Sequence, residues 1–220
     1  MGESALRLDR DGAAHFPEAA IPLLDRLEAL AASVPPDRAG ARLHGNPGLA
    51  ALLAPTALGA LAGAGMRPVR AILFDKSAAT NWALGWHQDR TIAVRRRVDV
   101  PGFGPWSVKQ GMPHVEPPFA LIEAMRTLRI HLDPGPADNA PLLIAPGSHR
   151  FGRIAEPRLA DIVARCGSVA CLAEAGDVWV YATPIVHASA AAAGGRHRRV
   201  LQVDFSADAL PSGLEWLGVV

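Results

Sequence analysis

The stretch Thr127-Leu128-Arg129-Ile130-His131-Leu132-Asp133 alternates between apolar and polar side chains. Successive side chains of a β-strand point to opposite faces, so the apolar residues of this stretch share one face, and Arg129 and His131 share the other. Residues 198–205 repeat the alternation, with Leu201, Val203 and Phe205 on the apolar face. Each strand therefore needs a covering layer on one side, and a ligand or a metal ion to satisfy the polar side chains on the other.

Short runs of the same kind occur elsewhere in the chain. They are Val69–Phe74, Trp86–Val94, Leu142–Ala145, Val169–Leu172, Val178–Tyr181 and Ile185–Ser189. Helical spacing is found earlier, in Pro17–Ser33 and in an Ala- and Leu-rich stretch from Pro47 to Met66 that Pro55 divides in two. Shorter helices are expected over Phe119–Met125 and Pro157–Arg165. Helices followed by many short strands indicate an α+β fold with a mainly β core, arranged as a sandwich or jelly roll.

The length of 220 residues provides for one domain with a substantial core. We expect residues 1–66 to form a helical cover over the apolar strand faces, and residues 67–206 to form the jelly-roll core. Residues 95–118 are rich in Gly and Pro and show no periodicity. Long irregular segments in compact domains are often lids or binding loops, and we expect this one to form a lid-like loop.

Charge and cysteine content exclude several classes of function. The 22 basic residues nearly balance the 21 acidic ones, so no positive excess is present for binding nucleic acid or an anionic membrane. The 2 cysteines are too few for a disulfide framework or a structural zinc site. Leu43–Met66 lacks charged residues, but Ala and Gly dominate it and Pro55 interrupts it, so we expect no membrane span. Without a secretory signal at the N-terminus, these features favour a cytoplasmic protein.

A histidine and a carboxylate two residues apart, His87 and Asp89, can hold one ion from the same face of an extended chain. The pair alone carries little weight, because a chain with 8 histidines produces such pairs by chance. His187 in a later strand completes a set of two histidines and one carboxylate, and Arg198 follows it by eleven residues. Such a set leaves coordination positions open and suits non-haem Fe(II).

With these residues the chain resembles the phytanoyl-CoA dioxygenase-like family of Fe(II)/2-oxoglutarate-dependent dioxygenases, over about residues 69–205. The motifs that carry the resemblance are Leu73-Phe74-Asp75-Lys76, Trp86-His87-Gln88-Asp89, Asp138-Asn139-Ala140-Pro141-Leu142, Pro146-Gly147-Ser148-His149, Gly176-Asp177 and His187-Ala188-Ser189. One departure is Ala140, which stands where the family usually has Gly.

The resemblance implies a double-stranded β-helix, a cupin-like jelly roll, with flanking N-terminal helices. It implies that His87, Asp89 and His187 bind Fe(II), and that Arg198 and Ser189 bind the distal carboxylate of the cosubstrate 2-oxoglutarate. With O₂, such an enzyme hydroxylates a small molecule and releases succinate and CO₂. Arg199 is a rival for the role of Arg198, but its parity places it on the apolar side of the strand.

Two other functions stay open from the residues. One is a cupin-like metal enzyme, a hydrolase or isomerase, that uses another ion at the same triad. The other is a jelly roll that binds a small metabolite without catalysis. An arginine and a serine placed to clamp a carboxylate favour the dioxygenase over the first, and the intact set of His87, Asp89 and His187 favours it over the second.

Further residues are candidates for contact with the cosubstrate or the substrate. Arg129 is a candidate for 2-oxoglutarate, because it lies on the polar face of its strand. The candidates for substrate contact are Trp86, Phe103, Trp106, Lys109, His114 and His131. Arginines cluster near these positions, so the substrate can be a small anionic molecule, and the net charge of +1 does not argue against this.

Overall fold

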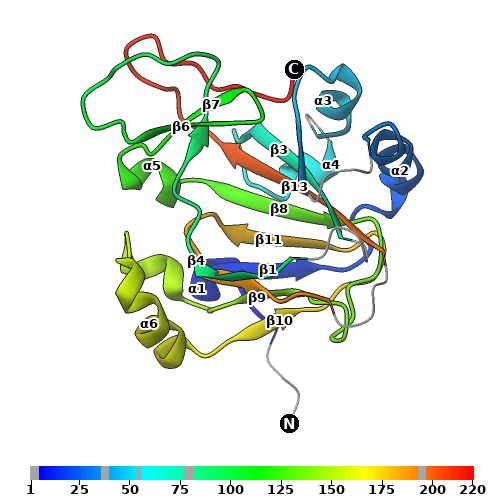
Figure 1. Cartoon of the computed structure of the whole chain (residues 1–220). Coiled ribbons are helices and arrows are strands. Elements are labelled where there is room, and N and C mark those ends of the chain that lie inside the picture. Colours follow the sequence, from blue (N-terminus) through cyan, green and yellow to red (C-terminus); the bar gives the residue numbers. More distant parts are fainter. Residues whose placement is uncertain (1–4, 36–39, 54–55, 77–81, 193–196) are drawn as a thin grey trace.

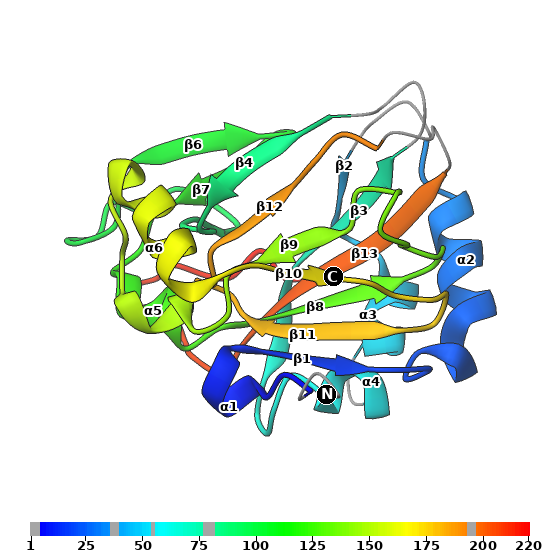
Figure 2. The ribbon, with the colours of Figure 1, turned by 90° about the horizontal axis from the view of Figure 1, so that it is seen from below.

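Two antiparallel β-sheets face each other and form the centre of the protein (Figures 1 and 2). The computed structural model describes residues 5–35, 40–53, 56–76, 82–192 and 197–220. The larger sheet has the strand order β1-β11-β8-β13-β3-β2, and the smaller one the order β10-β9-β12-β4. The larger sheet comprises β1 (Ala13–Phe16), β11 (Val178–Ala182), β8 (Arg126–His131), β13 (Arg198–Ser206), β3 (Arg67–Lys76) and β2 (Gly40–Leu43). The smaller comprises β10 (Val169–Cys171), β9 (Leu142–Ile144), β12 (His187–Ser189) and β4 (Leu84–His87). The arrangement is a jelly roll, so the α+β fold expected from the sequence is confirmed.

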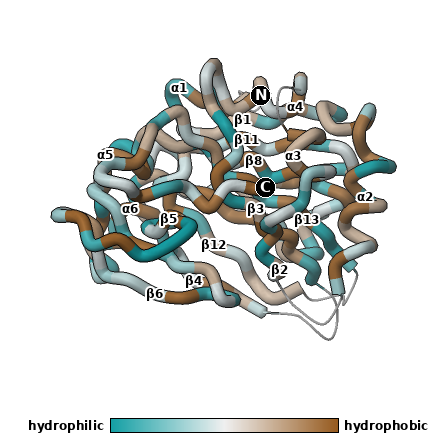
Figure 3. The backbone as a smooth tube through the Cα atoms, turned by 90° about the horizontal axis from the view of Figure 1, so that it is seen from above, coloured by the Kyte–Doolittle hydropathy of each residue, from teal (hydrophilic) through white to brown (hydrophobic). Residues whose placement is uncertain are grey.

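Helices cover the outer face of the larger sheet. They are α2 (Leu24–Ala32), preceded by a 3₁₀ turn at Ile21–Leu23, α3 (Pro47–Leu53) and α4 (Ala57–Ala60). Leu27 of α2 and Leu53 of α3 belong to one buried cluster with Leu128 of β8 and Leu201 of β13. Helix α2 alternates between hydrophobic and hydrophilic residues along the tube of Figure 3, as expected for a helix with one buried face. The predicted packing of the apolar strand faces under helices is therefore confirmed.

The inner face of the larger sheet is polar, as the alternation predicts. Neighbouring strands place Arg198 opposite Lys76, and Gln202 opposite Arg129. Farther along β13, Asp204 lies opposite Arg70. These six side chains point between the two sheets, and each is at most 6% exposed.

The first third of the chain contains two strands that the sequence pattern did not indicate. Strand β1 pairs with β11 at one edge of the larger sheet, and β2 pairs with β3 at the other. Both are only four residues long, and neither alternates clearly between apolar and polar residues. Their backbone pairing with an existing sheet edge fixes them, and local sequence does not record that partner.

Residues 95–118 differ from the irregular loop expected. They include a hairpin of β6 (Trp106–Lys109) and β7 (Met112–Val115), and β7 also pairs with β5 (Ile92–Ala93). Gln110 and Gly111 form the two-residue turn, with φ values of 50° and 78°. Two positive φ values fit the type I′ turn of a tight hairpin. The predicted strand Trp86–Val94 is accordingly divided, with β4 and β5 in different sheets.

The other helices lie around the ends of the sheets. They are α1 (Leu8–Asp11), α5 (Phe119–Glu123), α6 (Leu159–Cys166) and 3₁₀ turns at Ser148–Phe151 and Glu156–Arg158. The break expected at Pro55 lies outside the described residues, between α3 and α4. Within the described part of the chain, no helix has the length and apolar character needed to cross a membrane.

Candidate active site

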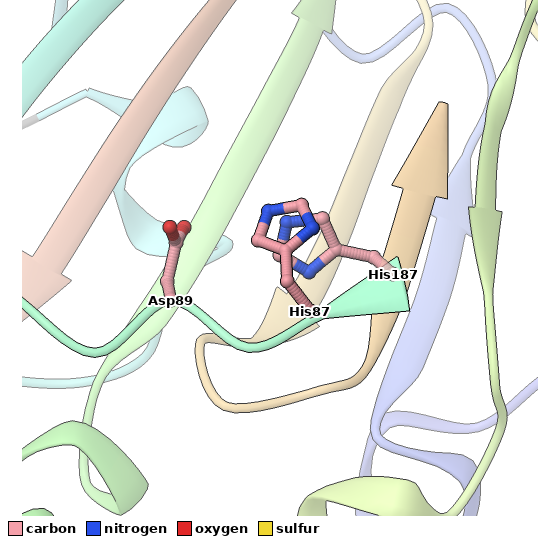
Figure 4. Close-up of side chains that lie close together, drawn as sticks. All are labelled: His87, Asp89 and His187. Atoms are coloured by element: carbon pink, nitrogen blue, oxygen red, sulfur yellow. The ribbon is translucent and has the colours of Figure 1, made fainter. Parts of the chain in front are cut away.

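His87, Asp89 and His187 come together between the two sheets (Figure 4). His87 ends β4 and His187 begins β12, and the antiparallel pairing of these strands sets the two histidines directly opposite each other. Asp89 follows two residues after His87, where the chain leaves the strand. One ligand atom from each residue lies within 4.8 Å of the others. Two imidazoles and one carboxylate at this spacing can hold one metal ion.

Backbone carbonyls orient both imidazole rings. Nδ1 of His87 is 2.8 Å from the carbonyl oxygen of Gly85, and Nδ1 of His187 is 2.9 Å from that of Ile185. A hydrogen on Nδ1 that donates to these oxygens leaves Nε2 with a free lone pair for a metal. Burial, and then the nearby His87, lower the pKa of His187 to about 4. His187 is therefore neutral at physiological pH, as metal coordination requires.

Asp89 belongs to a buried charge network. Nη2 of Arg70 is 3.6 Å from Oδ2 of Asp89, and Nε of Arg70 donates to Oδ2 of Asp204 at 2.5 Å. Burial opposes ionisation of Asp89, but the positive charge of Arg70 is the largest of the effects that outweigh it and hold its pKa below the usual value. The carboxylate is therefore ionised and available as a ligand.

The triad opens into a cavity of about 230 Å³ that both sheets line. At one end of it, Nζ of Lys76 donates to Oγ of Ser189 at 2.9 Å and to the carbonyl oxygen of Ala190 at 2.8 Å. Arg198 also lines the cavity and is 3% exposed. Its Nε and Nη1 have no hydrogen-bond partner among the described residues. A buried guanidinium with free donors is suited to binding a carboxylate of a ligand.

Arg198 and Arg199 point in opposite directions, as the parity argument predicts. Arg199 lies on the outer face, where its side chain pairs with Asp133 at 2.7 Å and Glu28 at 3.5 Å. Arg198 shares the cavity with Arg129, and burial together with the charge of Arg129 lowers the pKa of Arg198 to about 10. Arg129 donates from Nη1 to Oε1 of Gln202 at 2.9 Å. The cavity therefore holds a concentration of positive charge.

Of the six residues named for substrate contact, Lys109 is the one that lines the cavity. Trp86 packs beside α6, while Phe103 and Trp106 pack with the apolar cluster under the hairpin. His114 is fully buried, with Nδ1 2.9 Å from the carbonyl oxygen of Met112. His131 is 1% exposed and is not among the residues that line the cavity. Aromatic content and strand parity do not distinguish residues that line the cavity from residues of the hydrophobic core, because both kinds of residue are enclosed by the fold.

Two charged residues of the cavity are not singled out by the sequence. Arg42 comes from β2 and Arg70 from β3. A signal was present for Arg70, because Arg70, Ile72, Phe74 and Lys76 alternate with the apolar residues of β3. Arg42 had no such signal, since β2 is recognisable only by its pairing with β3.

Comparison with known proteins gives the family. The profile of the family Phytanoyl-CoA dioxygenase (PhyH) matches residues 46–200, which is more than half of the chain. No curated protein sequence matches.

Several solved structures share the fold. AviO1 from Streptomyces viridochromogenes Tue57 is 23% identical, with a TM-score of 0.59 and coverage of 94% of each chain. HygX from Streptomyces hygroscopicus, solved with nickel and 2-oxoglutarate, is 13% identical, with a TM-score of 0.60 over 90% of this chain and 84% of that one. SnoK, a non-heme alpha ketoglutarate dependent carbocyclase from nogalamycin biosynthesis, is 20% identical, with a TM-score of 0.61 over 100% of this chain and 88% of that one. The chain therefore belongs to the phytanoyl-CoA dioxygenase family of Fe(II)/2-oxoglutarate-dependent oxygenases.

Proposed function

We propose that this protein hydroxylates a small molecule, using Fe(II), 2-oxoglutarate and O₂ and releasing succinate and CO₂. The observation that carries the proposal is one cavity that combines the His-Asp-His set with a buried arginine whose donors are free. A metal hydrolase or isomerase would need the three ligands but not the arginine. A solved relative, HygX, holds nickel and 2-oxoglutarate, which supports the same cosubstrate here.

His87, Asp89 and His187 would hold the iron, each through one atom. Iron held by three ligands on one side supplies open positions at which a chelating cosubstrate and O₂ react. The carbonyls of Gly85 and Ile185 keep both imidazole rings in place. Arg70 keeps the carboxylate of Asp89 ionised.

Arg198 and Ser189 would bind the distal carboxylate of 2-oxoglutarate. The guanidinium of Arg198 offers two free donors, and Ser189 is fixed by the ammonium group of Lys76. Arg129 adds positive charge beside Arg198 and would assist in the same role. Burial of these groups strengthens their attraction for an anion, because little water competes.

Residues 95–118 would act as a cover over the iron. Their hairpin brings Lys109 to the cavity, while Phe103 and Trp106 anchor it in an apolar cluster. A covered site keeps water from a reactive centre until the substrate is present. Limited proteolysis of this segment should slow when iron, 2-oxoglutarate and substrate are all bound.

The test of the oxygenase function is anaerobic addition of Fe(II) and 2-oxoglutarate to the protein. The expected result is a visible metal-to-ligand charge-transfer band. The variant Arg198→Ala should lose the band at a 2-oxoglutarate concentration that saturates the unmodified protein, whereas Arg199→Ala should retain it. A missing band in the unmodified protein, or a full band in Arg198→Ala, would contradict the assignment. Substrate-stimulated succinate release in air then tests the hydroxylation.

A further inference from the structure

Two cations of the cavity, Arg42 and Lys109, are not among the residues proposed to hold the metal or the cosubstrate. Arg42 comes from the edge strand β2 and Lys109 from the hairpin strand β6, and both line the cavity together with Asp89 and Arg70. The two residues are far apart in the sequence, and the fold brings them to the same wall of the site.

A side chain at the hairpin turn joins these two elements. Oε1 of Gln110 accepts a hydrogen bond from the backbone N–H of Arg42 at 2.9 Å, and its Nε2 donates to the carbonyl oxygen of Gly40 at 2.7 Å. The amide of Gln110 thus pairs with the free edge of β2 much as another strand would. It fixes the residue that precedes it, Lys109, beside Arg42.

Neither cation has a carboxylate partner of its own among the described residues. Nε of Arg42 is buried without a hydrogen-bond partner there, and Nζ of Lys109 has only a long contact of 3.4 Å with Oγ1 of Thr91. The nearest carboxylate, Asp89, already pairs with Arg70 and is a candidate metal ligand. Burial, followed by the charges of Arg70 and Arg42, lowers the pKa of Lys109. An anion bound between Arg42 and Lys109 would offset the repulsion between these positive charges.

The pair lies away from the residues proposed for 2-oxoglutarate. Arg42 is opposite Ile72 in the sheet, four residues along β3 from Lys76, which contacts Ser189. Four residues of a strand correspond to roughly 13 Å. One cosubstrate carboxylate held at Arg198 and Ser189 therefore leaves Arg42 and Lys109 free.

We propose that Arg42 and Lys109 form a substrate subsite that binds an anionic group, either a carboxylate or a phosphate ester, on the Asp89 side of the metal centre. The inference rests on the proposed function, because it takes the Arg198 end of the cavity as the cosubstrate end. It narrows the substrate to small molecules that carry such a group. A guanidinium beside an ammonium group suits both kinds of oxyanion.

The test uses the protein loaded anaerobically with Fe(II) and 2-oxoglutarate, and three probes of similar size: benzoate, phenyl phosphate and benzyl alcohol. Binding is followed by calorimetry, and the charge-transfer band is recorded at each step to show that 2-oxoglutarate stays bound. At least one anion should bind about tenfold or more tightly than benzyl alcohol, since charge-assisted hydrogen bonds are worth roughly that much. Which anion binds better identifies the preferred oxyanion.

Variants connect the preference to the two residues. Arg42→Gln and Lys109→Gln should each weaken anion binding about tenfold, and Arg42→Lys should keep most of it. Their affinity for 2-oxoglutarate should stay within about twofold. Arg97→Gln is the matched control, because Arg97 lies near the same hairpin but is exposed and pairs with Asp99. A normal band with equal binding of all three probes, or with unchanged anion binding in both Gln variants, would overturn the subsite alone. Anion binding that depends on Arg42 and Lys109 without any band would keep the subsite and remove the oxygenase function.

Discussion

Arg70 lies 3.6 Å from the carboxylate of Asp89, and the same guanidinium donates to Asp204 at 2.5 Å. Asp204 also accepts a hydrogen bond from Oγ1 of Thr127 at 3.0 Å. Arg70 and Asp204 are nearly completely buried, so neither charge can be satisfied by water. The network thus ties the metal-side carboxylate to the centre of the larger sheet.

Removal of both members of this pair should cost less than the two single removals added together. Arg70→Gln leaves Asp204 buried without its cation, and Asp204→Asn leaves Arg70 with a poorer partner, so each single variant should lose about 3–5 kcal/mol of folding stability. The double variant Arg70→Gln/Asp204→Asn should lose clearly less than the sum of the two. Urea denaturation of the four proteins measures the coupling free energy, and additive losses would contradict a direct interaction.

Substitution of a metal ligand should weaken metal binding without unfolding the protein. His187→Ala or Asp89→Ala should weaken anaerobic Fe(II) binding by about 100-fold or more, because either change leaves only two protein ligands. His44→Ala is the control, since His44 is exposed and is not a member of the triad. Calorimetric titration with Fe(II) measures the affinity. Retention of full affinity in His187→Ala would place the metal elsewhere.

A second buried histidine should control stability at acidic pH. His131 is 1% exposed, and neither ring nitrogen has a hydrogen-bond partner among the described residues. Burial, followed by the charges of Arg129 and Arg198, lowers its pKa to about 3, although Asp177 acts in the opposite direction. Between about pH 6.5 and pH 3 the unfolded chain therefore binds a proton at this position that the folded protein does not. Folding stability should fall as the pH is lowered through this window.

The variant His131→Gln isolates that contribution. One proton changes the free energy of unfolding by about 1.4 kcal/mol per pH unit, so the slope of stability against pH between pH 4 and 6 should decrease by up to this amount in the variant. His44→Gln, at an exposed position, provides the comparison. Urea denaturation at several pH values gives the slopes. Equal slopes in His131→Gln and the unmodified protein would show that His131 does not titrate as described.

Alternation along two strands predicted which face of the larger sheet is covered by helices and which face lines the cavity. Leu128 and Leu201 do pack under the helices, and Arg129 and Arg198 do face the cavity. Arg42 could not be found in this way, because β2 exists through its pairing with β3 and through Gln110 of a distant hairpin. Strand identity at a sheet edge depends on a partner that the local sequence does not contain.

The hairpin illustrates a second limit. The segment 95–118 has many Gly and Pro residues, and its turn at Gln110-Gly111 lacks the Asn-Gly or Asp-Gly pair that marks most type I′ turns. The sequence predicts substrate contacts for the aromatic residues Phe103 and Trp106, but both pack against the apolar cluster that holds the hairpin in place. The composition of residues 95–118 marks the segment as unusual. The tertiary structure is needed to show that Lys109 is the residue of this segment that lines the cavity.

Ala140 has a left-handed backbone conformation with φ of 49°. A Cβ atom in this region of backbone conformation destabilises the folded protein by about 1–2 kcal/mol, and Gly avoids that cost. In the opposite direction, the greater chain entropy of Gly stabilises the unfolded state by up to about 1 kcal/mol. Ala140→Gly should therefore raise the free energy of unfolding by about 0.5–1 kcal/mol. Ala145→Gly, at a buried position without positive φ, should lower it by about 1 kcal/mol. Urea denaturation compares the two variants, and equal destabilisation by both would show that the backbone at Ala140 is not strained.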